Sequence, residues 1–318
     1  MRKKQSLILA ELYKELIPVN PYYKNKYKKT KDCGNYLEFL EKVNSKGKIV
    51  EKKLYQAYFC KGRLCPMCNW RRSLKLCSQL NDIITVARTE EPKLRYLFLT
   101  LTSKNVEGEN LEDEINKLNK SFAKLKRRKE VKAVVEGYFK VVEVTYNSDE
   151  DTYNPHLHIL LAVRSTYFNR NYIKQDRWTK LWQQSLKVNY KPMVNIQAVK
   201  NKDKLQKSDL VEDVKAYNQA MMSKAIKEVG KYAVKLDDFI KPDIDIKVID
   251  TLEFSLKNKR LATFGGYLLE IQKRLNLKDV EDDRDLIKIN KDDFDDKIKG
   301  NIISTIYRWN NKKNDYFS

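Results

Sequence analysis

Histidine is nearly absent from this chain, and long apolar runs are absent altogether. Only two histidines occur in 318 residues, both within 153–163. No stretch approaches the roughly 20 consecutive apolar residues of a transmembrane helix, and residues 6–16 are too short and too charged for a signal peptide. We therefore expect a cytoplasmic protein with no membrane partner. In that compartment five cysteines are more often metal ligands or thiols than disulfides.

Acidic residues are too few to balance the basic ones. The chain has 64 Lys+Arg against 43 Asp+Glu, a formal net charge of +21. A hydrophobic content of 42% with 11% aromatics indicates a folded protein rather than a disordered one. The charge points to a polyanionic partner, nucleic acid first. A lysine-rich composition without functional meaning explains the same number equally well.

The apolar pattern predicts an α+β fold, with alternation in the strands and a longer period in the helices. Strands are expected at 93–106, 136–147, 156–163 and 193–200. Helices are expected at 69–90, 110–130, 175–187 and 213–235. This order favours an antiparallel sheet with helices packed on one face. A helix and an irregular basic segment precede it (1–31), and a mostly helical region follows it (241–318).

The two histidines stand two residues apart in an expected strand. His156 and His158 therefore project from the same face, while Leu157 points to the other. A roughly symmetric hairpin places Glu143 opposite His158 on the same face. Two imidazoles and a carboxylate suit Mg²⁺ or Mn²⁺ in contact with a phosphate. The alternative is two histidines that only form local hydrogen bonds.

The helix expected at 213–235 carries polar groups on its inward stripe. Glu228 and Tyr232 are four residues apart, which places the carboxylate beside the phenol. A phenol near a metal-bound phosphate is a candidate nucleophile, and lysines such as Lys231 and Lys235 would offset developing charge. Taken alone, each residue is better explained without a function, Tyr232 as one of 19 tyrosines and Glu228 as a carboxylate that reaches the edge of the helix.

Four cysteines have spacing that suits a metal site. Cys65 and Cys68 form a C-x₂-C pair, and Cys33 and Cys60 complete a possible Cys₄ set for structural Zn²⁺. Buried thiols are the alternative. Cys77 lies in the following expected helix and is expected to be a core residue. The neighbouring Trp70, Arg71 and Arg72 either contact DNA phosphates or cover the knuckle.

Six segments, in order along the chain, resemble one known family. They are CGNYLEF (33–39), FCKGRLCPMCNWRRS (59–73), YLFLTLTS (96–103), PHLHILLAV (155–163), EVGKYAVK (228–235) and RLATFGGYLLEIQKRLNLKD (260–279). Together they resemble the HUH endonucleases, and specifically the Rep initiators of rolling-circle plasmids of Gram-positive bacteria. Each segment is weak alone, but their order is specific.

The resemblance implies a fold, an activity and partners. It implies a ferredoxin- or RRM-like core in which His156, His158 and a nearby acid hold a divalent ion; we choose Glu143. Tyr232 would nick one strand at the double-strand origin, keep the 5′ phosphate and free a 3′-OH for the host polymerase. Glu228 would activate water to end replication. Single-stranded DNA and a host helicase are further implied partners, and an oligomer is possible.

This interpretation divides the chain into three parts. Residues 1–92 form a basic, Cys-rich, zinc-binding segment, 93–240 the nicking domain, and 241–318 a C-terminal region that binds the origin or a partner. One rival is another HUH enzyme, a relaxase or single-strand transposase. The other is a zinc-containing nucleic-acid-binding protein without catalysis, which leaves Glu143 and Glu228 on apolar faces without a reason.

Overall fold

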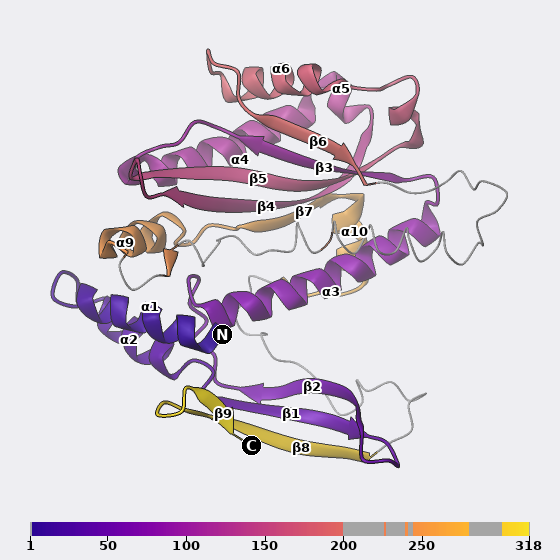
Figure 1. Cartoon of the computed structure of the whole chain (residues 1–318). Helices are drawn as coiled ribbons and strands as arrows, with labels where there is room; N and C mark the ends of the chain where they lie inside the picture. The colour runs from indigo at the N-terminus through magenta and orange to yellow at the C-terminus, as the bar shows by residue number, and fades with distance from the viewer. Residues whose placement is uncertain (1, 200–225, 227–238, 241–243, 280–300, 318) are drawn as a thin grey trace. The chain divides into compact units, whose positions relative to one another are not determined.

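The computed structural model describes residues 2–199, 226, 239–240, 244–279 and 301–317 (Figure 1). The chain forms two compact units, neither continuous in sequence. Unit 1 comprises Met1–Arg72, Ile240–Asp250 and Asp282–Ser318, and unit 2 comprises Ser73–Phe239 and Thr251–Glu281. The three-part division expected from the sequence stays a prediction. No helix among the described residues is both long and apolar enough to cross a membrane.

Unit 1 is built on a four-stranded antiparallel sheet in the order β2-β1-β8-β9. Two helices precede the sheet in sequence. Its elements are α1 (Arg2–Leu16), α2 (Tyr23–Asp32), β1 (Tyr36–Val43), β2 (Ile49–Ala57), β8 (Asn301–Asn310) and β9 (Asp315–Phe317). The central strand β1 pairs with β2 in a local hairpin and with β8 from the far end of the chain (Figure 1).

This sheet departs from the sequence-based expectations. Residues 23–32 form helix α2 instead of an irregular segment, and 301–310 form a strand in a region expected to be mostly helical. The sequence NIISTIYRWN explains the strand, since β-branched and aromatic side chains favour a pleated surface. The rest of that region contains α9 (Ile246–Ser255) and α10 (Tyr267–Arg274), with strand β7 (Ala262–Gly266) between them.

Unit 2 contains a five-stranded antiparallel sheet in the order β6-β3-β5-β4-β7. Four of its strands match the expected ones. They are β3 (Arg95–Thr102), β4 (Val135–Asn147), β5 (Thr152–Val163) and β6 (Val194–Ala198). The predicted α+β class and antiparallel sheet are confirmed, and β5 occupies the centre. Pro155, expected just before this strand, lies inside it, one residue beyond the part that pairs with β3.

Helices cover both faces of the unit 2 sheet. On one face Leu157, Ile159 and Leu161 are buried, and α4 (Leu111–Arg127) contacts β5. On the other face, α10 and the unit 2 part of α3 (Pro66–Glu90) pack with β3, β4 and β5 in one apolar cluster. The histidines project from this second face. The sequence predicted helices on one face of the sheet only, whereas the structure has helices on both.

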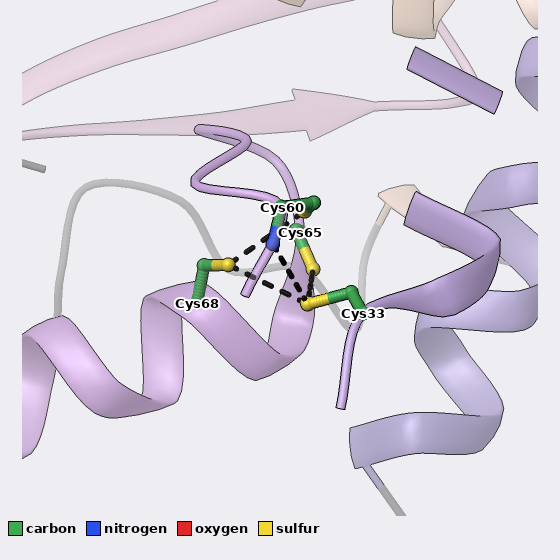
Figure 2. A group of neighbouring side chains, drawn as sticks. All are labelled: Cys33, Cys60, Cys65 and Cys68. Atoms are coloured by element: carbon green, nitrogen blue, oxygen red, sulfur yellow. Dashed lines mark hydrogen bonds between the residues drawn. The ribbon is translucent and has the colours of Figure 1, made fainter. Parts of the chain in front are cut away.

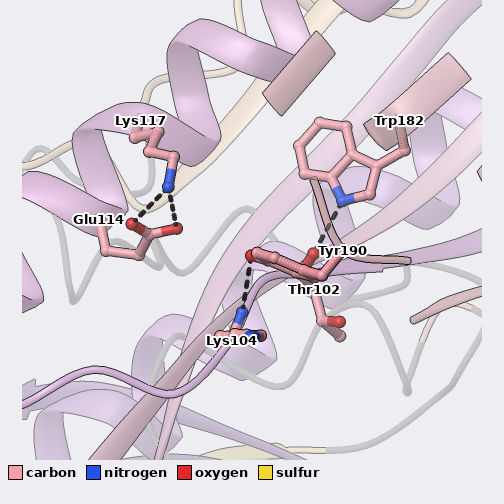
Figure 3. A network of polar contacts seen from close by, with 6 residues as sticks. All are labelled: Thr102, Lys104, Glu114, Lys117, Trp182 and Tyr190. Atoms are coloured by element: carbon pink, nitrogen blue, oxygen red, sulfur yellow. Dashed lines mark hydrogen bonds and ion pairs between the residues drawn. The ribbon is translucent and has the colours of Figure 1, made fainter. Parts of the chain in front are cut away.

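The end of β3 is fixed next to the histidine-bearing strand. The indole of Trp182, fully buried on α6 (Gln175–Leu186), donates to the Thr102 carbonyl at 2.8 Å, and Tyr190 accepts from the Lys104 amide at 3.1 Å (Figure 3). Thr102 is the register partner of His156. These contacts therefore hold the strand end that flanks the histidine pair. Figure 3 also shows the ion pair between Glu114 and Lys117 on α4.

Two candidate metal centres

The first centre lies on the adjacent strands β4 and β5 of unit 2. Glu143 Oε2 is 2.7 Å from Nε2 of His158 and 3.4 Å from Nε2 of His156. The sheet register pairs Glu143 with His156, so the predicted pairing with His158 was wrong by two residues. A two-residue slip keeps each side chain on its face. The predicted trio is therefore brought together in spite of the slip.

Each imidazole is held through its other ring nitrogen. Nδ1 of His156 lies 3.0 Å from the Asn154 carbonyl oxygen, and Nδ1 of His158 lies 3.2 Å from Oγ1 of Thr100. A carbonyl oxygen only accepts, so His156 carries a proton on Nδ1 and, when neutral, presents the Nε2 lone pair. Such partners orient histidines that bind metals. The Phe98 ring also stacks on His158, with 5.6 Å between centroids.

The charges of this trio favour a positive species among its atoms. Burial disfavours the Glu143 carboxylate, but hydrogen bonds from His156 and His158 outweigh burial and hold the pKa of this carboxyl well below its usual range. When His156 is neutral, its Nε2 lone pair faces the Glu143 carboxylate oxygen at 3.4 Å, and the two repel one another. Protons on the rings or one shared cation relieve that repulsion.

The donor set suits a divalent ion that keeps open coordination positions. One carboxylate and two imidazoles are three protein ligands, and their donor atoms lie within 4.8 Å of one another. The imidazole side chains of His156 and His158 keep 13% and 18% of their surface exposed. Three ligands with solvent access leave room for a substrate oxygen, the pattern of catalytic rather than structural metal sites.

The expected nucleophile and its neighbours lie outside the described residues. This applies to Glu228, Lys231, Tyr232 and Lys235. One residue of that helix is described: Ile226 is helical and buried, and it belongs to the apolar cluster on the histidine-bearing face. Its carbonyl accepts from the Cys77 thiol at 3.9 Å. Ile226 was not part of the inward stripe expected from the sequence.

The second centre is a group of four cysteines in unit 1, three of them buried and Cys60 partly exposed (Figure 2). The Sγ of Cys33 lies 3.5 Å from that of Cys65 and 3.6 Å from that of Cys68, and Cys60 and Cys68 are 3.7 Å apart. Four thiolates at about 2.3 Å from a tetrahedral ion would be about 3.8 Å apart, whereas a disulfide needs about 2.05 Å. The sulfur spacing fits a shared ion.

The β1–β2 hairpin explains why a long sequence gap separates Cys33 from Cys60. The hairpin joins Leu37 to Ala57, so the residues flanking it return to the same end. Gly34 follows Cys33 with φ +73°, and a Cβ there would approach the Met67 side chain to 2.8 Å. A glycine is therefore required for the chain to turn from the cluster into β1.

Polar groups support the cysteine cluster. The amide of Cys60 donates to Cys33 Sγ and the amide of Gly62 to Cys60 Sγ, both at 3.4 Å. Arg72 is buried and donates to the carbonyls of Lys61 (2.6 Å) and Gly62 (3.0 Å). Of the two roles considered for Arg72, these contacts support covering the knuckle. Hydrogen bonds with Cys60 and Cys65, together with burial, raise the pKa of the Cys33 thiol.

Two supporting residues were not predicted from the sequence. Thr100 lies in the segment YLFLTLTS (96–103), and the sequence predicted no role for it. The register of β3 and β5 places it beside His158. The Asn154 carbonyl gives no sequence signal, because any residue supplies one.

The comparison with protein families decides the relationship. The family model described as "Replication protein" matches residues 51–317. This chain belongs to the replication protein family.

Individual relatives of this replication protein extend over nearly the whole chain. "Protein rep" of Streptococcus pneumoniae serotype 2 (strain D39 / NCTC 7466) is 42% identical over 320 residues, covering 99% of this chain and 90% of its own. "Protein rep" of Bacillus amyloliquefaciens is 39% identical, over 97% of this chain and 90% of the relative's length. "Replication protein" of Staphylococcus aureus is 36% identical, covering 75% and 97%. These relatives confirm the resemblance to Rep proteins. No solved structure matches.

Proposed function

We propose that this replication protein is a plasmid initiator that nicks one DNA strand at its origin with a tyrosine nucleophile and a divalent ion. The observation that carries the proposal is the convergence of Glu143, His156 and His158 on one face of the sheet, with both imidazoles partly exposed. A zinc-containing binding protein without catalysis would not need a second, open set of metal donors. Plasmid replication needs a strand opening that leaves a primer end.

The trio would hold Mn²⁺ or Mg²⁺, which suits carboxylate and imidazole donors and phosphate ligands. Such an ion, when bound, polarises phosphoryl oxygens and so favours attack at phosphorus. Thr100 and the Asn154 carbonyl keep the two imidazoles oriented toward the shared point. The cysteine cluster would hold Zn²⁺ with all four positions filled, a structural role.

The nicking step transfers a phosphoryl group from DNA to the protein. The Tyr232 oxygen forms an ester with the scissile phosphorus, and the bond from phosphorus to the 3′ oxygen breaks. The phenol loses a proton and the 3′ oxygen gains one, so the step is balanced and yields a 3′-OH for the polymerase. Lys231 and Lys235 would offset charge on the phosphate.

The position of Ile226 supports Tyr232 as a candidate. Ile226 packs in the same cluster as Val141, and Val141 is the register partner of His158. Six residues span at most about 20 Å when fully extended. The short chain distance from Ile226 is therefore what favours Tyr232 as the nucleophile in this proposal.

Ending a round of replication requires release of the covalent link. Glu228 would accept a proton from water as the water oxygen attacks phosphorus and the bond to the Tyr232 oxygen breaks, and the Tyr232 oxygen then gains a proton, which restores the phenol. Hydrolysis by a carboxylate makes the reaction run once, whereas a second tyrosine would re-form a covalent link. The proposal includes origin DNA in duplex and single-stranded form as ligand, and a host helicase and polymerase as partners.

The test uses supercoiled plasmid carrying the protein's own origin, with Mn²⁺ or Mg²⁺. The wild type is expected to yield open circles with protein linked to the 5′ end. Tyr232→Phe should yield neither, because it lacks the attacking oxygen. Nicking by Tyr232→Phe at the wild-type rate would refute the mechanism.

A second variant separates the two chemical steps. Glu228→Ala should nick normally but accumulate the covalent adduct after replication. Tyr217→Phe, a tyrosine earlier in the same expected helix, serves as the matched control and should behave as the wild type. Complete loss of nicking in Glu228→Ala would contradict the proposed division of labour.

A further inference from the structure

A cavity of about 540 Å³ opens beside the edge strand β7 of unit 2. Its walls come from α4, β4, β7 and α10. Four cationic side chains and one carboxylate line it: Lys126, Lys140, Arg260, Lys273 and Asp279. We call it the basic cavity. The carboxylate of Asp279 is already paired with Arg260, so the cavity keeps an excess of positive charge.

Lys140 is the unusual member of the basic cavity. Its side chain lies 7% exposed, and its ammonium donates to Oδ1 of Asn119. Within the part of the chain that the structure describes, no carboxylate forms an ion pair with it. Burial, with the nearby charge of Lys126, lowers the pKa of Lys140 to about 8. A buried ammonium held by a neutral amide is costly, since its hydration is lost without a counter-charge.

Lys126 does not relieve this cost. Its ammonium donates to the Tyr138 hydroxyl at 2.8 Å and lies over the Tyr138 ring, 4.4 Å from the centroid. It thus adds a second positive charge on the same side of the cavity. Like charges gathered around a solvent-open cavity are stabilised when an anion enters it.

The basic cavity is separate from the metal centre. Lys140 and Glu143 both belong to β4, but they are three residues apart and therefore point to opposite faces of the sheet. Lys140 faces the α4 side, in register with Ile159, whereas Glu143 faces the other side with His156. The nicking chemistry therefore leaves these lysines unexplained.

We propose that the basic cavity binds a phosphate of the DNA backbone, with Lys140 as its buried contact and Lys126, Arg260 and Lys273 around the opening. This inference rests on the proposed function for the identity of the polyanion. A phosphate would supply the negative counter-charge for the Lys140 ammonium, and a lysine ammonium binds phosphate as a point charge. The contact would be independent of base sequence.

The main experiment replaces Lys140 by methionine, which keeps the length of the side chain and removes its charge. Two effects of opposite sign are expected. The free protein should unfold at a higher temperature, because a buried unpaired charge is gone. Affinity for origin DNA should fall about tenfold, and the slope of log affinity against log salt should shrink by about 0.9 for duplex or about 0.7 for single-stranded DNA.

Binding is measured by fluorescence anisotropy without added divalent ion, so the result does not depend on nicking. Lys180→Met removes an exposed lysine of α6 and is the matched control, expected to keep the wild-type melting temperature. An unchanged salt slope in Lys140→Met overturns the proposal. If Lys140→Met fails to fold, Lys273→Gln at the exposed rim decides, and an unchanged slope there overturns it equally.

Inorganic phosphate separates the two sources of the same ligand chemistry. It should raise the melting temperature of the wild type and not that of Lys140→Met, and it should compete with DNA. If inorganic phosphate binds the cavity but Lys140→Met keeps the wild-type slope of log DNA affinity against log salt, the cavity serves a small ligand. That outcome contradicts the proposal. A wild type that binds the origin but never nicks would refute the proposed function and leave the basic cavity standing.

Discussion

The two candidate metal centres differ in how completely protein atoms surround the shared point. The cysteine cluster brings four donors of one kind together, three of them fully buried. The other centre brings three donors of two kinds together, with both imidazoles partly exposed. A closed set of four holds structure, and an open set of three leaves positions for a substrate.

The supporting contacts differ in the same direction. Around the cysteines, backbone amides and Arg72 fix a loop, so the surroundings maintain a shape. Around the histidines, Thr100 and Asn154 fix ring orientation, so the surroundings aim lone pairs at one point. Under the proposed function, the difference between the two donor sets corresponds to a folding role for the centre in unit 1 and a chemical role for the centre in unit 2.

The largest effect is expected at the closed centre. Cys68→Ser removes one of four ligands, and because ion binding and folding are coupled at such sites, unit 1 should lose its zinc and its ordered structure. Elemental analysis and limited proteolysis measure this. Cys77→Ser, outside the cluster, is the control and should retain zinc. Full zinc content in Cys68→Ser would remove the distinction between the centres.

A smaller but specific loss is expected at the open centre. His158→Ala should reduce Mn²⁺-dependent nicking at least about a hundredfold, because the ion and its effect on the phosphate are lost. Zinc content and the melting temperature of the chain should change little. A variant that loses zinc together with nicking would show that the centres are not separate.

A positioning residue should have an intermediate effect. Thr100→Val keeps the side-chain shape but loses the hydroxyl at Nδ1 of His158, so Mn²⁺ affinity should fall about tenfold. Titration calorimetry measures it, and saturating Mn²⁺ should restore most of the nicking rate. Thr179→Val loses a comparable hydrogen bond on α6 and should leave Mn²⁺ affinity unchanged. Equal effects of both changes would assign Thr100 a purely structural role.

The last effect concerns pH and a residue of neither centre. Because burial lowers the pKa of Lys140 to about 8 from 10.5, the folded state holds fewer protons than the unfolded state between about pH 8 and 10.5. The free energy of unfolding should therefore rise with pH across that window, by on the order of 3 kcal/mol from this lysine. Denaturation of the wild type against Lys140→Met isolates the contribution. Parallel pH curves would contradict it.

Four of the five strands of the unit 2 sheet could be predicted from sequence because they are rich in apolar, β-branched and aromatic residues, whereas β7 lies in a region expected to be mostly helical. The unit 1 sheet could not be predicted. Strand β1 (YLEFLEKV) and strand β2 (IVEKKLYQA) are diluted with Lys and Glu, and β1 also pairs with β8, more than 250 residues away in sequence. Pairing at that separation leaves no local signal.

The membership of both centres could be predicted, but their geometry could not. The position of the hairpin turn decides which residues of the two strands pair. The predicted symmetric loop paired Glu143 with His158, two residues beyond its observed partner His156. The assignment of Glu143 to the centre is still correct, because a shift of two residues keeps its side chain on the same face of the sheet. The hairpin that brings Cys33 to Cys60 was not foreseen, since neither of its strands was. The roles of Tyr232 and Glu228 stay predictions, as these residues lie outside the described part of the chain.

The most direct test of the central claim is an electron paramagnetic resonance titration of Mn²⁺ into the zinc-loaded protein. The account predicts one saturable Mn²⁺ site in the wild type and none in the double variant His156→Ala/His158→Ala, with equal zinc content in both proteins. Saturable Mn²⁺ binding in the double variant equal to that of the wild type would contradict the assignment of Glu143, His156 and His158 as the catalytic metal centre.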